Sequence, residues 1–355
     1  MEHNKSISIA KGIGISLMVI GHSPCPAWLC HWIYSFHMPL FFLITGFLFK
    51  EKYLDTPKKF VINKFKGYYW PFVKWGIIFL LFHNLLSYFN IYGTSYSLKE
   101  HLNKAFYIIT LNGSEQLLGG YWFLIESLFA SLIAFVMLWT LYKSRNLLTS
   151  IKFTNWGGWY NLLLISILTL MLIIGALLLG EHKLLIKIKS ATLLATALFL
   201  IGYLIKKKDV RIPTLLSFAL LAITFGITLC MDRGLSIYST GIDLFIILGL
   251  SLLSILAILS ISFQISESKV GRFLDFLGTN TLVILTFHFL SFKLVNLFII
   301  FRDDLPIERL ADFASISTNK PFDWVLYSIV GIGLPLAAVY LIKNFWILRV
   351  RLLKT

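Results

Sequence analysis

Long apolar runs alternate with short polar segments along the whole chain, at intervals of roughly 30 residues. Each run is close to the roughly 20 residues that an α-helix needs to cross the hydrocarbon core of a bilayer. The runs are too long for the strands of an outer-membrane barrel and lack their period-two alternation. Ten spans are predicted, at 7–27, 31–50, 70–90, 119–142, 160–180, 184–205, 213–231, 240–263, 279–301 and 323–346. The pattern therefore predicts an all-α, polytopic integral membrane protein.

The charged residues between these spans give them an orientation. The 355-residue chain has 32 Lys and Arg against 17 Asp and Glu, a net charge of +15. Most of the basic residues lie in alternate segments, which are the N-terminus, the loops near 50–66, 143–152, 206–211 and 269–272, and the tail. Because segments rich in Lys and Arg stay in the cytoplasm, we expect both termini there. The expected location is the inner, or cytoplasmic, membrane.

Composition supports the same class of protein. The chain is 57% hydrophobic and 14% charged, which is typical of a membrane protein. Its basic residues are spread over six membrane-flanking segments instead of forming one patch, so membrane lipids are expected partners and nucleic acid is not. No linker, repeat or low-complexity stretch divides the chain, so residues 1–355 are expected to form a single transmembrane domain. The sequence does not indicate an oligomeric state.

Two features of the segments outside the spans stay open. Cys25 and Cys30 share one short loop, and a disulfide between them requires that this loop face an oxidising space. The three cysteines have no metal-binding spacing, so no metal is expected. The outer segments 91–118 and 302–322 are longer than the others, and the second is expected to be either a short interfacial helix or a solvated loop.

Ionisable residues inside the apolar spans are the candidate chemistry, because a bilayer disfavours them. The first span, "KGIGISLMVIGH", places Lys11 and His22 eleven residues apart. This spacing puts both on one helix face, about 16 Å apart along the axis. A neutral histidine is a common general base, and a cytoplasmic lysine suits a phosphate group. Lys64 and Lys66 in "NKFKGYYWPF" are further phosphate-binding candidates, although this segment also fits a juxtamembrane anchor.

Two more histidines are expected near the depth of His22. His37 lies in "YSFHMPLFF" and His288 in "LTFHFL". Pro39 is expected to kink the helix just after His37. For any one of these histidines, a hydrogen bond to a neighbouring helix is the plain structural alternative. Convergence of all three favours a functional site.

The fourth span contributes one acid and one aromatic residue to this set. Glu126 lies inside the span and needs a partner such as a histidine or a lysine. Trp122 begins the same span, where it is either an aromatic interface anchor or part of a binding tunnel.

A lysine at one end of a polar stripe and a base at the other suit an acyl-CoA donor. Acyl-CoA combines a phosphorylated nucleotide head with a long thin arm that ends in a thioester. His22 would deprotonate a hydroxyl arriving from the opposite side, and that hydroxyl would attack the thioester. The sequence contains no nucleophile-elbow motif and no zinc motif.

Five segments resemble the membrane acyltransferase-3 family in order and spacing, and the similarity is closest to its fucose 4-O-acetylase-like branch. These segments are "IAKGIGISLMVIGH", "YSFHMPLFFLITGFLF", "NKFKGYYWPF", "YWFLIESLF" and "LGTNTLVILTFHF". The resemblance implies a ten-helix core. It also implies an acyl-CoA-dependent O-acyltransferase, usually an O-acetyltransferase that uses acetyl-CoA. The implied acceptor is a hydroxyl of a cell-envelope carbohydrate or glycolipid.

The resemblance also implies roles for individual residues. His22 would be the base and Lys11 would contact the donor, helped by Lys64 and Lys66. The expected catalytic group is His22, His37, Glu126 and His288, and the expected acceptor contacts are Trp122 and Asn280. Two positions depart from the family pattern, because Lys11 stands where arginine is frequent and Ser8 where an aspartate is frequent.

Two other functions compete with acyl transfer. A polysaccharide or lipid-linked sugar transporter also needs intramembrane His, Glu and Lys, but the sequence shows no inverted repeat. A non-catalytic partner in glycan assembly is the third alternative, and the intact Lys11–His22 pair argues against it.

Overall fold

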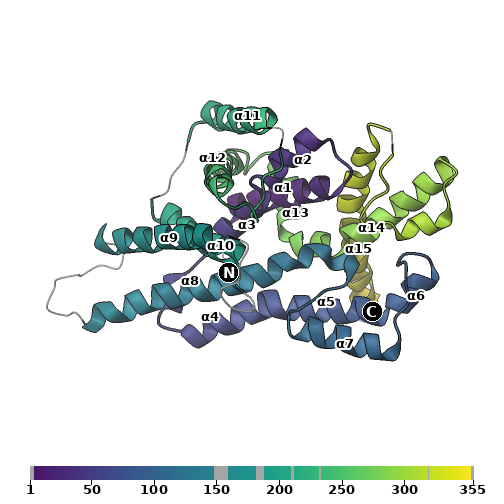
Figure 1. Ribbon diagram of the computed structural model, residues 1–355, viewed down its shortest axis with the longest axis horizontal. Coiled ribbons are helices and arrows are strands. Elements are labelled where there is room, and N and C mark those ends of the chain that lie inside the picture. The colour runs from purple at the N-terminus through teal and green to yellow at the C-terminus, as the bar shows by residue number, and fades with distance from the viewer. Residues whose placement is uncertain are drawn as a thin grey trace.

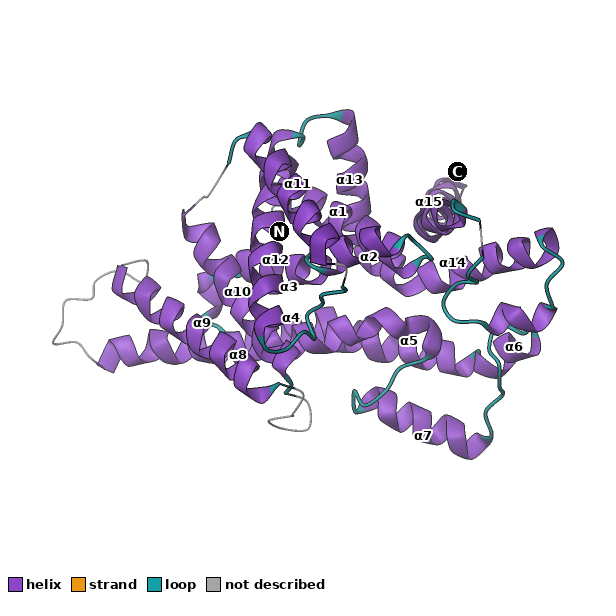
Figure 2. Ribbon diagram, turned by 45° about the horizontal axis from the view of Figure 1, so that its top comes forward, coloured by secondary structure: helices purple, strands orange, loops and turns teal. Residues whose placement is uncertain are grey.

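The structure is a computed structural model that describes residues 4–147, 159–180, 188–208, 212–231, 233–318 and 320–352. Within these ranges the chain forms helices and no strand (Figures 1 and 2). The first eight α-helices are α1 Lys5–His22, α2 Ala27–Tyr34, α3 His37–Phe47, α4 Pro57–Lys64, α5 Trp70–Leu81, α6 His83–Tyr88, α7 Leu98–Ile109 and α8 Trp122–Leu147. The others are α9 Trp159–Leu179, α10 Ser190–Lys208, α11 Thr214–Met231, α12 Ile242–Gln264, α13 Lys269–Thr279, α14 Thr281–Arg302 and α15 Asp323–Leu352. Four short helical turns are η1 Glu51–Tyr53, η2 Phe65–Tyr69, η3 Gln116–Tyr121 and η4 Ile307–Ala311.

Eight helical segments of the described chain are long and apolar enough to cross a membrane. The protein is therefore an all-helical, multi-pass membrane protein, as the apolar runs predict. The predicted span 7–27 corresponds to α1, and the predicted span 70–90 corresponds to α5 and α6. Neither of these predicted spans is among the eight segments. The count of ten spans and the cytoplasmic location of both termini stay predictions. Residues 184–187 of the predicted span 184–205 lie outside the described residues.

Several helices begin at a polar side chain that accepts a hydrogen bond from one of the free N–H groups of the first turn. The Asn4 side chain accepts a hydrogen bond from the Ile7 N–H at the start of α1, and Ser268 accepts one from Gly271 at the start of α13. Ser97 and Glu100 form a reciprocal capping box that begins α7. Because the first N–H groups of a helix have no internal partner, these side chains stabilise the helix ends.

The helix break near His37 differs from the prediction. Phe36, with φ −145° and ψ −20°, separates α2 from α3, and His37 is the first residue of α3. Pro39 is the third residue of α3, where the missing N–H would have had no helical partner. The kink predicted after His37 is therefore wrong, and the break precedes the histidine.

The two long segments predicted to lie outside differ in structure. Segment 91–118 contains α7, which packs beside α5 in both ribbon views (Figures 1 and 2). The described residues of segment 303–322 are mostly irregular and include the short turn η4. Arg302 ties the two ends of this segment together through Asp303 and Asp323. The Arg302 guanidinium, with Lys320, holds the pKa of Asp303 well below its usual range.

Two helix pairs approach so closely that only glycine fits between them. A Cβ added to Gly12 of α1 would lie 2.0 Å from the Leu274 carbonyl oxygen of α13. A Cβ on Gly46 of α3 would lie 1.8 Å from the Phe199 oxygen of α10. Such contacts through small residues are typical of helix pairs in membranes. They fix α1 and α3, which together form one wall of the cavity described next.

Candidate active site

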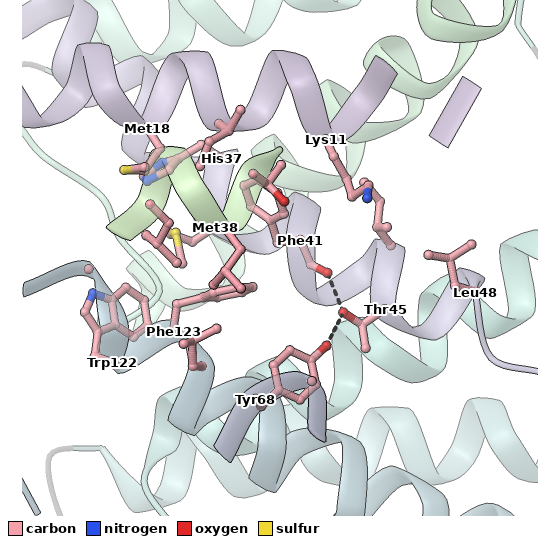
Figure 3. A pocket seen from close by; sticks show the side chains of 18 of the residues that line it. Lys11, Met18, His37, Met38, Phe41, Thr45, Leu48, Tyr68, Trp122 and Phe123 are labelled. Atoms are coloured by element: carbon pink, nitrogen blue, oxygen red, sulfur yellow. Dashed lines mark hydrogen bonds between the residues drawn. The ribbon is translucent and has the colours of Figure 1, made fainter. Parts of the chain in front are cut away.

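A cavity of about 870 Å³ lies between α1, α3, η2, the beginnings of α8 and α14, and the loop at 236–238. A volume of this size is typical of a small-molecule site. The lining is mostly apolar, and its aromatic part includes Phe41, Phe123 and Tyr68 (Figure 3). Lys11 and His22 of α1 both line this cavity. The predicted polar stripe therefore faces one continuous space.

His22 is paired with His288 beside this cavity. The Nδ1 atom of His22 lies 2.9 Å from Nε2 of His288. Phe289 stacks on the His22 ring with centroids 4.9 Å apart and an angle of 19° between the planes. His288 itself is fully buried. The two histidines, 266 residues apart in the chain, thus form one rigid pair.

The positions of the protons in this pair follow from its partners. Nδ1 of His288 lies 3.1 Å from the Ile284 carbonyl oxygen and 3.0 Å from that of Leu285. Since carbonyl oxygens only accept, this Nδ1 carries a hydrogen, and Nε2 of a neutral His288 is an acceptor. His22 Nδ1–H therefore donates to His288, and the lone pair of His22 lies on Nε2. No hydrogen-bond partner of that Nε2 is found among the described residues.

His37 lies in the cavity wall but outside this pair. It lines the same space, and its ring is 5.0 Å from that of Tyr34 in an edge-to-face arrangement. Its Nδ1–H donates to the Ile33 carbonyl oxygen at 2.8 Å. This bond spans the break between α2 and α3, so it both holds the break and directs Nε2 of His37 away from α2. His22 and His37 therefore both line the cavity, and His288 lies behind His22 as its hydrogen-bond partner.

The three predicted lysines also line the cavity. Lys11 contributes from α1, and Lys64 and Lys66 from the junction of α4 and η2. The Lys64 ammonium lies 5.3 Å from the ring centroids of both Phe60 and Tyr68. Asp275 of α13 acts electrostatically on Lys11. An acid from another helix thus accompanies this lysine, although Ser8 stands at the family's aspartate position.

A π-helical turn aims this basic segment at the cavity. Residues Phe65–Tyr69 form η2, a wider turn between α4 and α5. Such turns are rare and are frequent at functional sites, because the extra residue reorients the side chains around it. Tyr68 from this turn makes a 3.3 Å hydrogen bond to Thr45 of α3 (Figure 3). The turn thereby joins the lysine segment to the opposite wall.

The histidine end of the cavity includes a close-packed glycine and an aromatic wall. Gly120 of η3 lies beside the pair, since an added Cβ would lie 3.9 Å from Cε1 of both His22 and His288 and 2.9 Å from Cδ1 of Leu285. Trp122, the first residue of α8, lines the cavity next to Tyr238, with ring centroids 5.3 Å apart. Tyr238 belongs to the loop between α11 and α12, and its side chain is 49% exposed. These two rings form the aromatic wall.

Two predicted residues lie outside the lining of the cavity. Glu126 is buried and accepts a 2.6 Å hydrogen bond from Thr192 of α10. Asn280 joins α13 to α14, and its side-chain amide donates to the Phe276 carbonyl oxygen at 2.8 Å. The roles proposed for both stay predictions.

Sequence reasoning missed three buried ionisable residues. Lys293 of α14 is 3% exposed and donates to two main-chain carbonyl groups. His83 and Glu115 form a buried pair at 2.8 Å, with His83 stacked on the Tyr96 ring at 3.6 Å. Lys293 was visible as a charge within an apolar run, the signal that identified His288. The pairing of His83 with Glu115, 32 residues apart, has no signal in the sequence.

One protein family matches this chain over almost its whole length. A family model described as "Acyltransferase domain" (Acyl_transf_3) matches residues 4–343. The match covers nearly the whole chain, including every element that lines the cavity. No curated protein and no solved structure matches the chain.

Proposed function

The chain belongs to the acyltransferase-3 family, which makes it a membrane acyltransferase, and from this premise we propose that it is an acetyl-CoA-dependent O-acetyltransferase. The proposed acceptor is a hydroxyl of a cell-envelope carbohydrate or glycolipid. The observation that carries the proposal is the His22–His288 pair, in which His22 lines the same cavity as Lys11. The fucose 4-O-acetylase-like branch is part of the proposal. The match gives no support to the transporter alternative.

His22 acts as the general base in this proposal. Its Nε2 takes the proton of the acceptor hydroxyl as the hydroxyl oxygen attacks the thioester carbon. The carbon–sulfur bond then breaks, and the proton passes from His22 to the leaving thiol. His288 accepts the Nδ1–H of His22 at 2.9 Å, which fixes the tautomer and the orientation of the ring.

The basic end of the cavity holds the donor. Lys11, Lys64 and Lys66 present ammonium groups that suit phosphate oxygens. Along α1 the distance from Lys11 to His22 is about 16 Å, so an extended thin arm is required between phosphate and thioester. The mostly apolar lining suits such an arm, since few polar groups there would lose water.

The test is a thiol-release assay on the purified full-length protein in nanodiscs. Acetyl-CoA is supplied with and without crude envelope glycan, and acetyl incorporation into the glycan is measured in parallel. Glycan-dependent thiol release with matching incorporation is the expected result. Binding of acetyl-CoA without release would reject the acceptor class, and no binding of any acyl-CoA would reject the donor. Acetyl found on His22 by mass spectrometry would replace direct transfer with an acyl-enzyme route.

Replacing Lys11 with methionine is expected to raise the KM for acetyl-CoA by about 10- to 100-fold. This range corresponds to one hydrogen bond between charged groups. Acetyl-pantetheine lacks the nucleotide phosphates, so its KM should be equal in the wild type and in Lys11→Met. Steady-state kinetics with both donors measure this difference.

The matched control is Lys74→Met, because Lys74 is an exposed lysine of α5 that does not line the cavity. Its KM for acetyl-CoA should equal that of the wild type. An equal rise for acetyl-CoA and acetyl-pantetheine in Lys11→Met would contradict a phosphate contact.

Replacing Tyr238 with alanine is expected to raise the KM for the glycan acceptor by about tenfold while leaving the KM for acetyl-CoA unchanged. The phenol combines a flat apolar face with a polar tip and packs beside Trp122, an arrangement that suits a sugar ring. Tyr88→Ala is the control, since Tyr88 is an 80% exposed tyrosine of α6 outside the cavity lining. A change confined to the KM for acetyl-CoA would contradict the assignment of Tyr238 to the acceptor site.

A further inference from the structure

Lys293 lies within a membrane-spanning helix and has no role in the proposed chemistry. Its ammonium donates to the carbonyl oxygens of Leu310 and Asp312, each at 2.8 Å. Among the described residues, no carboxylate lies within ion-pair distance of it. A buried cation is costly unless its donors are satisfied. The chain therefore uses this lysine to hold the main chain of the outer segment 310–312 against α14.

The held segment continues into a contact with the histidine pair. Phe313 follows directly, and its ring centroid lies 4.8 Å from that of Phe289. Phe289 in turn stacks on His22 at 4.9 Å and lies 4.0 Å from the His288 ring. Phe313 also packs on Gly119, where an added Cβ would be 3.2 Å from its ring. A chain of ring contacts thus runs from Phe313 through Phe289 to His22.

A second set of bonds holds the far end of the same segment. Tyr327 of α15 accepts a hydrogen bond from the Ile316 N–H at 3.0 Å and donates to Asn296 of α14. Asn296 lies one turn beyond Lys293 on the same helix. Lys293 and Asn296 of α14 therefore hold the two sides of Phe313, the first directly and the second through Tyr327. The same helix carries His288.

We propose that Lys293 is a positioning residue that latches residues 310–313 over the outer side of the histidine pair, so that the acceptor hydroxyl reacts in preference to water. The inference rests on the proposed acyl transfer. A base next to a bound thioester also activates water, and closing the site suppresses that hydrolysis. In the closed arrangement Phe313 and Phe289 cover His22 from the outside, while Nε2 stays open to the cavity.

The test compares acetyl transfer with acceptor-independent hydrolysis in the full-length protein. Lys293→Met keeps the length of the side chain but removes the donors to Leu310 and Asp312. We expect the ratio of transfer to hydrolysis to fall by about tenfold or more, with an unchanged KM for acetyl-CoA. Lys293→Arg restores donors for both carbonyl groups and should bring the ratio back to within about threefold of the wild type.

Two further variants separate latching from general stability. Phe313→Ala leaves the buried lysine intact and should lower the ratio to the same extent as Lys293→Met. Lys320→Met removes an exposed lysine that pairs with Asp303 in the same segment and should leave the ratio unchanged. A wild-type ratio in folded Lys293→Met or in Phe313→Ala would overturn the proposal.

Hydrogen exchange gives a readout that does not depend on catalysis. Lys293→Met should increase exchange across 307–318, including the Ile316 amide bonded to Tyr327. Unchanged exchange would overturn the latch even if the enzyme were inactive. A wild-type protein that releases no thiol from acetyl-CoA with any glycan would instead reject the proposed function, so the two failures are distinguishable.

Discussion

Alanine at position 22 is expected to lower the rate of glycan-dependent acetyl transfer by about 10³-fold or more, with normal expression and an unchanged affinity for acetyl-CoA. The loss follows from removing the Nε2 of His22, which is the proposed base and makes no hydrogen bond to any described residue. General base catalysis alone contributes about 10²- to 10⁴-fold. Thiol release and acetyl incorporation measure the rate, and equilibrium binding of acetyl-CoA measures the affinity.

Two histidine variants serve as comparisons. His31→Ala removes a histidine of α2 that lies outside the cavity lining and packs near Gly234, so it should act like the wild type. His288→Gln should give an intermediate loss of about 10- to 100-fold, because His22 keeps its Nε2 but loses the ring that fixes its tautomer. Normal acetylation by His22→Ala would contradict the assignment of the base.

Alanine at position 46 is expected to destabilise the fold by about 3 kcal/mol or more, or to prevent recovery of folded protein. The added Cβ would lie 1.8 Å from the Phe199 carbonyl oxygen, and a Cβ added to Gly202 of α10 would lie 2.0 Å from the Leu43 carbonyl oxygen. Both neighbours are main-chain atoms, so neither can turn aside as a flexible side chain would. Since α3 also carries His37 and Thr45, the cavity wall would move with it. Thermal unfolding in detergent measures the effect.

Gly249→Ala is the matched control for this prediction. Gly249 lies inside α12, and an added Cβ there meets no atom within 4 Å. Alanine should leave the stability unchanged or raise it by about 0.5–1 kcal/mol, since glycine weakens a helix interior. Equal unfolding temperatures for Gly46→Ala and Gly249→Ala would contradict the prediction, because α3 and α10 could then move apart without loss of stability.

The sequence predicts the fold class because membrane spans are local. Runs near 20 apolar residues identify most of the long helices, including α12 and α14, without any knowledge of their neighbours. Interruptions are harder to predict. Proline commonly breaks a helix, but Pro39 is the third residue of α3, where proline is tolerated. The break lies at Phe36 instead.

The candidate site is predictable where a residue type alone is unusual. Lys11, His22 and His288 stand out as ionisable groups in apolar runs, and the structure brings all three to one region. Partner identity depends on three-dimensional packing and is not local. Thr192 of α10 donates a hydrogen bond to Glu126 from 66 residues away, and no feature of the sequence indicates this contact.

The hydrogen-bond chain from His22 ends within the protein. His22 donates to His288, and His288 donates only to the Ile284 and Leu285 carbonyl oxygens, which cannot pass a proton on. A proton taken at Nε2 therefore has one exit, back into the cavity and onto the leaving group. A continuous chain of ionisable groups across a membrane could instead conduct protons from one side to the other. Because this hydrogen-bond chain ends at main-chain carbonyl groups, the proposed catalysis by His22 would leave the proton gradient of an energised membrane intact.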